Sequence, residues 1–240
     1  MSALHLSLPP LRELWSGFLH LLYPELCVAC GAAIPAGESC FCFRCQLHLP
    51  ASDMYKTREN EFTDRLWGRL NLESAAAMYY FTRKSPIQQA LHQLKYHNQP
   101  DIGVKIGRLF GQKLKTSALF HSVQAVVPVP LHPKKERLRG YNQSAMFAQG
   151  ISEAMDIPAL NKALVRRKFT ETQTKKKRME RFDNVDDVFE VARPAQIEGK
   201  HLLLVDDVLT TGATLEVCGQ ALLNIQNTRL SMATIAIAVN

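Results

Sequence analysis

Blocks of apolar residues, separated by polar turns, predict a chain in which strands and helices alternate. The four apolar residues at 202–205 are too few for a helix, so they predict a strand that is buried on both faces, as in a parallel sheet. The pattern predicts further strands at 75–82, 125–130, 188–191 and 229–239, and helices from Ser85 to Tyr96, from Asp101 onward, at 142–155 and at 213–224. An α/β fold is therefore expected, with a parallel sheet flanked by helices.

Two adjacent carboxylates, Asp206 and Asp207, follow the strand at 202–205. Backbone N–H groups and the positive end of a helix dipole are expected to meet in the loop that comes next, which therefore predicts a phosphate site. The two carboxylates could accept hydrogen bonds from sugar hydroxyls or hold a hydrated Mg²⁺. The residues of this loop and its approach are Val208, Leu209, Thr210, Thr211, Gly212, Ala213 and Thr214.

Two other interpretations of this stretch are available. Asp pairs at strand ends commonly cap the next helix, with no ligand involved. A Walker-B strand of a nucleotide hydrolase also ends in acids, but it requires a G-x-x-x-x-G-K-[ST] loop, and the sequence contains none. An acid pair after a strand would, on its own, favour the capping role.

Length and charge restrict the ligands that are expected. The chain has 240 residues, enough for one well-packed core and a small appendage, and a formal net charge of +7. Residues 134–181 contain 13 Lys/Arg against 5 Asp/Glu, a local net charge of +8, so the rest of the chain is nearly neutral. Polyanionic ligands are expected for the basic segment.

Residues 11–22 carry apolar side chains at helical spacing, interrupted by Arg12, Glu13 and His20. This pattern predicts an amphipathic helix that docks on the protein itself, with contact to a membrane surface as the alternative. No apolar run reaches the length of a transmembrane helix, and no basic stretch precedes an uninterrupted apolar core as in a secretory signal. A cytoplasmic protein is expected.

Five of the six cysteines lie between Cys27 and Cys45. In a cytoplasmic protein, such clustering favours a metal site over disulfides. The pairs Cys27/Cys30 and Cys42/Cys45 have the C-x2-C spacing through which two thiolates share one tetrahedral ion, which predicts a structural zinc site. Cys40 is an alternative to Cys42, although Cys42 repeats the spacing of the first pair.

These features predict three regions: an N-terminal amphipathic helix with a zinc-knuckle module at 1–49, a polar connection at 50–73, and the main α/β domain at 74–240. Lys95 and Tyr96 are expected to be surface or packing residues. A basic loop is expected after Pro130, leaving the same sheet edge as the acid pair, and a long basic excursion at 160–189. The cations of the excursion are Arg166, Arg167, Lys168, Lys175, Lys176, Lys177 and Arg178.

Several motifs occur in order along the chain: P-V-P-L-H at 128–132, R-G-Y-N-Q at 139–143, R-x-x-x-T-x-T-Q at 166–173 and R-x-x-N at 181–184. The string at 206–214 resembles the phosphoribosyl pyrophosphate (PRPP) signature of type I phosphoribosyltransferases. Together with that string and the cysteine pairs, the motifs resemble the ComF-like proteins of bacterial natural competence. The match runs from about Leu22 to Val239.

The resemblance implies a type I phosphoribosyltransferase-like domain with a small N-terminal zinc module, linked to the uptake or processing of transforming DNA. The acid pair would hold the ribose of PRPP, with Mg²⁺, and residues 210–214 its 5′-phosphate. The loop after Pro130 would face the pyrophosphate, and the region of Thr170 would form a lid. Glu136 and Leu138 depart from a uniformly basic loop, which leaves Arg137 and Arg139 as the candidate pyrophosphate ligands.

Two classes of function are consistent with these features. In the first, an enzyme displaces pyrophosphate from PRPP, as in nucleobase salvage or amidotransferase chemistry, although no general base or acceptor is identified. In the second, the protein is a binding module, in which a former transferase site and the basic surface hold single-stranded DNA, with or without PRPP as a regulator. A competence helicase or other DNA-uptake proteins would then be further partners.

Overall fold

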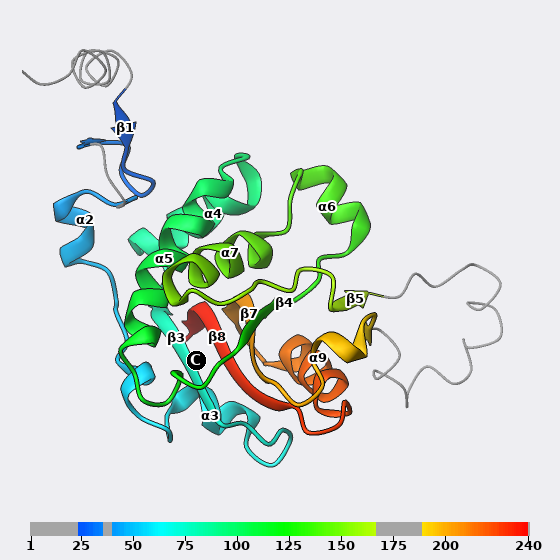
Figure 1. Ribbon diagram of the computed structural model, residues 1–240. Helices are drawn as coiled ribbons and strands as arrows, with labels where there is room; N and C mark the ends of the chain where they lie inside the picture. The colour runs from blue at the N-terminus through cyan, green and yellow to red at the C-terminus, as the bar shows by residue number, and fades with distance from the viewer. Residues whose placement is uncertain (1–23, 36–39, 167–188, 240) are drawn as a thin grey trace, which may run out of the picture.

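The computed structural model describes residues 24–35, 40–166 and 189–239, and a parallel sheet forms its centre (Figure 1). The sheet consists of β3 (Ser74–Phe81), β8 (Arg229–Ala238), β7 (His201–Leu209) and β4 (Ala125–Pro128), which are paired in the order β3-β8-β7-β4. All of these pairings are parallel. The α/β fold with a parallel sheet, predicted from the alternating pattern, is confirmed.

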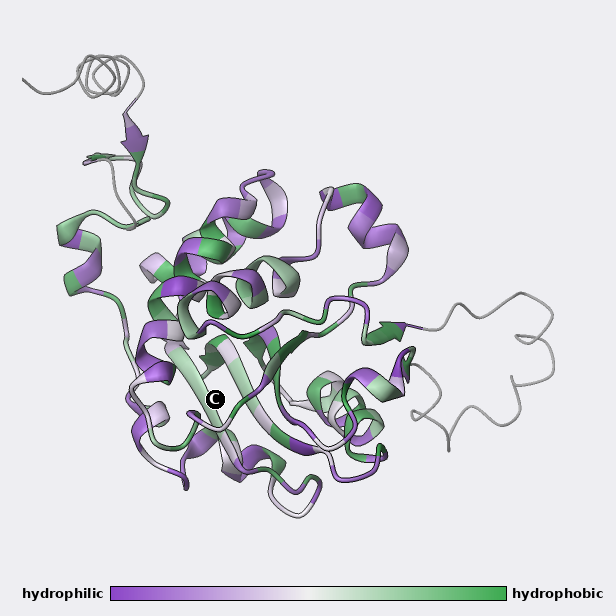
Figure 2. Cartoon of the chain, viewed as in Figure 1, coloured by the Kyte–Doolittle hydropathy of each residue, from purple (hydrophilic) through white to green (hydrophobic). Residues whose placement is uncertain are grey.

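Helices cover both faces of the sheet. α4 (Pro86–Tyr96), α5 (Pro100–Lys115) and α7 (Gln143–Met155) lie on one side, and α9 (Ala213–Leu223) lies on the other (Figure 1). The apolar residues of β7, Leu202 to Val205, are fully buried between these layers, as expected for a strand covered on both faces. Figure 2 shows hydrophobic residues on the central strands and hydrophilic residues on the outer faces of the helices.

α5 and α7 approach each other through glycines. A Cβ atom at Gly107 would lie 2.3 Å from the carbonyl oxygen of Phe147, and one at Gly150 would lie 2.1 Å from that of Val104. Real Cβ contacts are never this short, so the two helices pack backbone against backbone at this crossing. The crossing fixes α7 on the sheet, and the first turn of α7 lies beside β7.

Short elements precede the sheet in the chain. β1 (Glu25–Leu26) and β2 (Ala33–Ile34) pair antiparallel, and α2 (Phe43–Leu47) follows. Residues 50–73, predicted to be a polar connection, contain the 3-10 helix η1 (Met54–Lys56) and α3 (Glu61–Leu66). The backbone N–H of Ser52 in this segment donates to the carbonyl of Met78 in β3 at 3.0 Å. The division of the chain into three regions stays a prediction.

β7 is longer than the strand predicted at 202–205. It continues to Leu209, so Asp206 and Asp207, predicted to follow the strand directly, lie within it. Pairing with β8 explains the extension, because Asp206 lies opposite Thr234 and Leu209 opposite Ile237. β4 ends at Pro128, opposite Val205, so β8 alone is paired with β7 beyond that point.

The segment predicted to be a basic loop after Pro130 forms a helix instead, α6 (Pro133–Arg139). His132 caps its start by accepting a hydrogen bond from the N–H of Lys134 at 3.1 Å, and Gly140 ends it at φ 80°. Pro133 at the first helical position is the sequence signal that indicates this helix.

The predicted basic excursion begins and ends in a small hairpin. β5 (Leu164–Arg166) and β6 (Phe189–Val191) pair antiparallel, and the 3-10 helix η3 (Pro194–Gln196) follows. Several predicted features lie outside the described residues: the N-terminal amphipathic helix and the candidate cations Arg167, Lys168, Lys175, Lys176, Lys177 and Arg178. Among the described helices, none is long and apolar enough to cross a membrane.

Candidate functional site

Side chains from two helices hold the acid pair of β7, Asp206 and Asp207. The hydroxyl of Ser144, in the first turn of α7, donates to Asp206 Oδ1 at 2.7 Å. The backbone N–H of Asp207 donates to the same oxygen at 2.8 Å. Lys95 Nζ, in the last turn of α4, lies 2.8 Å from Asp207 Oδ2. The acid pair therefore lies in the part of β7 that extends past the end of β4. There, α4 and α7, which cover the same face of the sheet, contact β7.

Asp206 is difficult to ionise in this setting. Burial and the neighbouring charge of Asp207 raise the pKa of Asp206 to about 7, although the hydroxyl of Ser144, the N–H of Asp207 and the charge of Lys95 act in the opposite direction. A carboxyl group with this pKa is only partly ionised at neutral pH. A ligand that brings hydroxyl donors or a cation would favour the fully ionised pair.

Lys95 is a site residue that was not predicted from the sequence. The helical pattern assigns it to surface or packing, but its ammonium group pairs with Asp207 and its side chain is only 25% exposed. Spacing along the helix does not identify this contact. The sequence does predict two helices between the strands at 75–82 and 125–130, whereas one crossover helix is enough to join parallel strands. The additional helix, which carries Lys95, is the one available sign of a further role.

Residues of α3 contact the loop between β7 and α9. Arg65 donates to the carbonyl of Thr210 at 3.0 Å. Gly212 is buried at φ 86°, a backbone conformation that favours glycine, and a Cβ atom there would lie 2.9 Å from the end of the Leu66 side chain. The exposed residues of the loop are Thr210, Thr211, Ala213 and Thr214.

The start of α9 has the properties of an anion site. Its N-cap is Gly212, which provides no capping side chain, and the nearest hydroxyl contact is a long one of 3.5 Å from the N–H of Ala213 to Thr211 Oγ1. The first N–H groups of a helix need acceptors from outside the helix. An anionic oxygen at this exposed turn would supply them.

The two arginines of α6 differ in their surroundings. Arg137 is exposed. Arg139 is half-buried, donates to Gln143 Oε1 at 2.8 Å, and its guanidinium carbon lies 5.5 Å from the centre of the Tyr96 ring. Arg139 is thus linked to the helices that carry Lys95 and Ser144, whereas Arg137 points to solvent.

Of the candidate cations in the predicted lid, Arg166 is described. It lies at the end of β5, with its guanidinium carbon 5.4 Å from the centre of the Phe189 ring in β6. A cation–π contact of this kind joins the two strands of the hairpin. The structure does not bring Arg166 into the hydrogen-bonded group around the acid pair.

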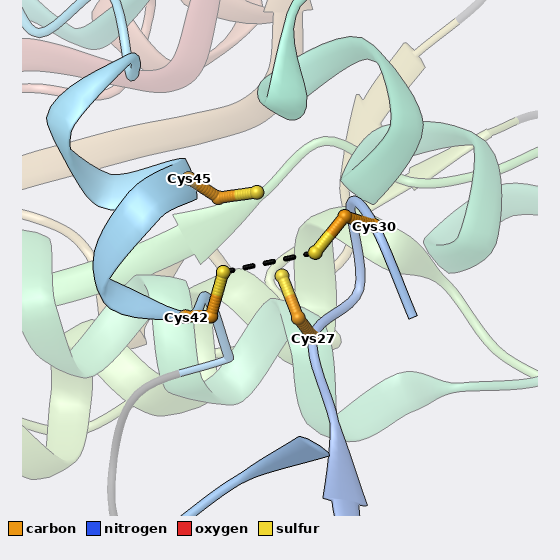
Figure 3. A group of neighbouring side chains, drawn as sticks. All are labelled: Cys27, Cys30, Cys42 and Cys45. Atoms are coloured by element: carbon orange, nitrogen blue, oxygen red, sulfur yellow. Dashed lines mark hydrogen bonds between the residues drawn. The ribbon is translucent and has the colours of Figure 1, made fainter. Parts of the chain in front are cut away.

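A second cluster gathers four cysteines at the N-terminal part of the described chain (Figure 3). The sulfur atoms of Cys27, Cys30, Cys42 and Cys45 all lie within 4.8 Å of one another, and those of Cys30 and Cys42 are 3.7 Å apart. In a tetrahedral zinc site with Zn–S bonds of about 2.3 Å, neighbouring sulfurs are about 3.8 Å apart. The cluster could therefore hold a metal ion, and its geometry is consistent with zinc.

Local backbone structure accounts for this arrangement. The N–H of Gly31 donates to the carbonyl of Cys27 at 2.8 Å, and Gly31 has φ 72°, which forms the tight turn expected after the first pair. Cys42 occupies the N-cap position of α2, and Cys45 lies within that short helix. The set that comes together is the one with repeated C-x2-C spacing, and Cys40 is not part of it.

The thiols differ in how readily they ionise. Burial opposes ionisation of Cys27, but backbone N–H donors including that of Cys42 outweigh it and lower the pKa of Cys27 to about 7. Burial and the neighbouring sulfurs raise the pKa of Cys45. Burial also raises the pKa of Cys40 to about 12, so this thiol is neutral at physiological pH. A metal ion bound by the cluster would favour the thiolate form of its ligands.

Comparisons with known proteins agree with this architecture. The family profile described as "Phosphoribosyl transferase domain" matches residues 92–239. Competence protein F of Haemophilus influenzae is 33% identical over 134 residues, which cover 54% of this chain and 58% of that protein. DNA utilization protein YhgH of Escherichia coli is 30% identical over 141 residues, which cover 58% of this chain and 61% of that protein. The chain thus matches about three fifths of the length of these curated relatives.

Among solved structures, glutamine PRPP amidotransferase from B. subtilis, complexed with ADP and GMP, aligns with a TM-score of 0.42 and 19% identity, covering 60% of this chain and 30% of that one. The family profile covers more than half of the chain, and the curated relatives are competence and DNA utilization proteins. The chain therefore belongs to the phosphoribosyl transferase domain family and, within that family, is similar to ComF-type competence proteins.

Proposed function

We propose that this chain binds PRPP at the carboxyl edge of its sheet. The observation that carries the proposal is that one strand, β7, carries the carboxylates of Asp206 and Asp207 near its carboxyl end and leads into the exposed turn that starts α9. The vicinal hydroxyls of the ribose would donate to the carboxylates. The 5′-phosphate would accept hydrogen bonds from the N–H groups and hydroxyls of residues 210–214.

The pyrophosphate end of the ligand would face α6, with Arg137 and Arg139 as proposed partners. Asp206 and Asp207 offer carboxylate oxygens, the ligand type that Mg²⁺ prefers, and such an ion would offset the charge of the pyrophosphate. The zinc proposed for the cysteine cluster is structural, because four thiolates leave no open position for chemistry.

Transfer of the phosphoribosyl group is the enzymatic extension of this proposal. An acceptor nucleophile would form a bond to C1 of the ribose as the bond from C1 to the pyrophosphate oxygen breaks. We assign no general base, and the acceptor is unidentified. PRPP binding is therefore the part of the function to test first.

Thermal unfolding in the presence of PRPP and Mg²⁺ tests this binding. A ligand that binds only the folded state at about 100 times its Kd adds about 2.7 kcal/mol to the free energy of unfolding, so the midpoint should rise. Asp206→Asn combined with Asp207→Asn should abolish the rise and keep the fold, because Asn has nearly the same shape. An equal rise in the double variant would show that the acid pair does not hold the ribose.

Single-stranded DNA binding is a second candidate function. Its support is the local net charge of +8 at 134–181 and the names of the relatives, which include a competence protein and a DNA utilization protein. The described part of this segment includes α6, whose Lys134, Lys135 and Arg137 are exposed. In this proposal the protein acts in the cytoplasm, together with a competence helicase or other DNA-uptake proteins.

Anisotropy titrations with a labelled oligonucleotide at several salt concentrations test the DNA proposal. Binding through phosphates weakens steeply with salt, because counterions are released from the nucleic acid. Replacing Lys175, Lys176, Lys177 and Arg178 by Ala should weaken binding and lower the salt slope by up to about one unit for each phosphate that is no longer bound. Unchanged affinity would remove these four residues from the interaction.

A further inference from the structure

The ion pair between Lys95 and Asp207 places a lysine directly on one carboxylate of the proposed ribose site. Nζ lies 2.8 Å from Oδ2, and the side chains are only 25% and 16% exposed. Lysine heads are strongly hydrated, so drawing one into a half-buried site requires a specific electrostatic partner. Here the partner is Asp207, and the adjacent acid, Asp206, has a raised pKa.

Residues next to Lys95 and Ser144 in the chain are also linked to each other, through Arg139 of α6. Tyr96, the neighbour of Lys95, stacks under Arg139, and Arg139 donates to Gln143 at 2.8 Å. The residue after Gln143 is Ser144, which donates to Asp206. Lys95 therefore approaches the acids from α4, on one face of the sheet, whereas the turn that starts α9 belongs to the opposite face (Figure 1).

This arrangement matches the two ends of PRPP, and the inference that follows rests on the proposed function. With the 5′-phosphate at the start of α9 and the ribose hydroxyls at the acids, the pyrophosphate would extend toward Lys95 and Arg139. Pyrophosphate carries more negative charge than one carboxylate, and the four-carbon stem of lysine lets its head change partners without backbone motion.

We propose that Lys95 is a specificity-determining residue that neutralises Asp207 in the free protein and moves to the pyrophosphate group when PRPP binds. The ribose hydroxyls then take over Asp207. A ligand with the same ribose and 5′-phosphate but no pyrophosphate gains nothing from Lys95. The lysine thereby favours PRPP over ribose 5-phosphate.

Calorimetric titrations of PRPP, pyrophosphate and ribose 5-phosphate, each with Mg²⁺, into the full chain test this role. Lys95→Met should weaken PRPP and pyrophosphate binding by about tenfold or more, the usual effect of losing a charge-assisted hydrogen bond, and leave ribose 5-phosphate as tight as before or tighter. Lys95→Arg should restore part of the loss. Lys105→Met is the matched control, because the Lys105 side chain is 23% exposed and its ammonium group pairs at 2.5 Å with Glu25, which is not a residue of the proposed site.

The outcomes separate three cases. Equal losses of PRPP and ribose 5-phosphate in Lys95→Met would show that the lysine only positions Asp207, and unchanged PRPP and pyrophosphate binding would show that it has no ligand; either result overturns the inference while the proposed function stands. If PRPP does not bind the wild type, both fail. A thermal midpoint in Lys95→Met similar to that of the wild type, measured without ligand, excludes misfolding as the cause of a loss.

Discussion

The cysteine cluster and the acid pair each bring together ionisable side chains of one kind, but the two sites differ in how the negative charge of these side chains is offset. Lys95, Ser144 and a backbone N–H offset the charge of the acid pair from within the fold. The sulfur atoms of the cluster lie against one another, within 4.8 Å, and the pKa of Cys45 is raised in part by the other three. A site of the first kind can exchange ligands while staying folded. We expect a site of the second kind to depend on an ion that remains bound.

Removal of the metal should have the largest effect that follows from this contrast. Cys45→Ser should lose the ion and unfold the part of the chain around β1, β2 and α2, because apparent binding free energies of structural zinc are about 10–16 kcal/mol at pH 7. The sheet, whose core is apolar, should keep its cooperative unfolding transition. Elemental analysis together with limited proteolysis measures both effects.

The matched variant for that experiment is Asp206→Asn combined with Asp207→Asn, which alters the acid pair and should leave the metal content unchanged. Native protein that contains no metal, and whose N-terminal part still resists protease, would contradict the proposed dependence on an ion.

A moderate effect is expected from Asp206→Asn alone, and it should depend on pH. The pKa of Asp206 is about 7 in the folded protein against an ordinary value of 3.8. Between these values the folded state holds a proton that the unfolded state has released, so the wild type loses stability as pH rises from about 4 to 7. The variant has no such loss and should be more stable at pH 8, by on the order of 1–2 kcal/mol, since solvent around this half-buried group reduces the full effect.

Urea unfolding of both proteins at several pH values measures this difference. The amide oxygen of Asn can accept the hydrogen bonds from Ser144 and from the N–H of Asp207, so packing should change little. A stability difference that stays constant between pH 4 and pH 8 would mean that Asp206 ionises normally.

The smallest effect is expected at Cys40. This thiol is buried and its pKa is raised to about 12, so Cys40→Ala removes a neutral packing group and should cost about 1 kcal/mol or less. The zinc content should stay at the wild-type level. Loss of the ion would instead make Cys40 a ligand, and the ligand set would then need revision.

Features that depend on local sequence could be predicted. Ser85 and Pro86 mark a helix start, and the Ser85 hydroxyl does accept a hydrogen bond from the N–H of Gln88 at 3.3 Å. The repeated C-x2-C spacing selects the four cysteines that come together, because each pair is held by its own turn or helix. The apolar run at 202–205 identifies the central strand, since few other structures bury four consecutive side chains.

Features that depend on distant parts of the chain could not be predicted. The length of β7 is set by its partner β8, so the strand extends past two acids that the local pattern places directly after its end. The contact of Lys95 with Asp207 joins residues more than a hundred positions apart. The hydrogen bond from Arg65 of α3 to the carbonyl of Thr210 also joins distant parts of the chain. Nothing near Arg65 in the sequence indicates this contact.

The glycine crossing of α5 and α7 gives the two partners of the acid pair unequal freedom. Ser144 stands on a helix whose backbone is locked against its neighbour at Gly107 and Gly150, so its hydroxyl is a fixed reference point. Lys95 reaches its acid through a long, rotatable side chain. A bulkier residue at either glycine would therefore separate α5 from α7 and displace the Ser144 hydroxyl. The reach of Lys95 from α4 to Asp207 would not change.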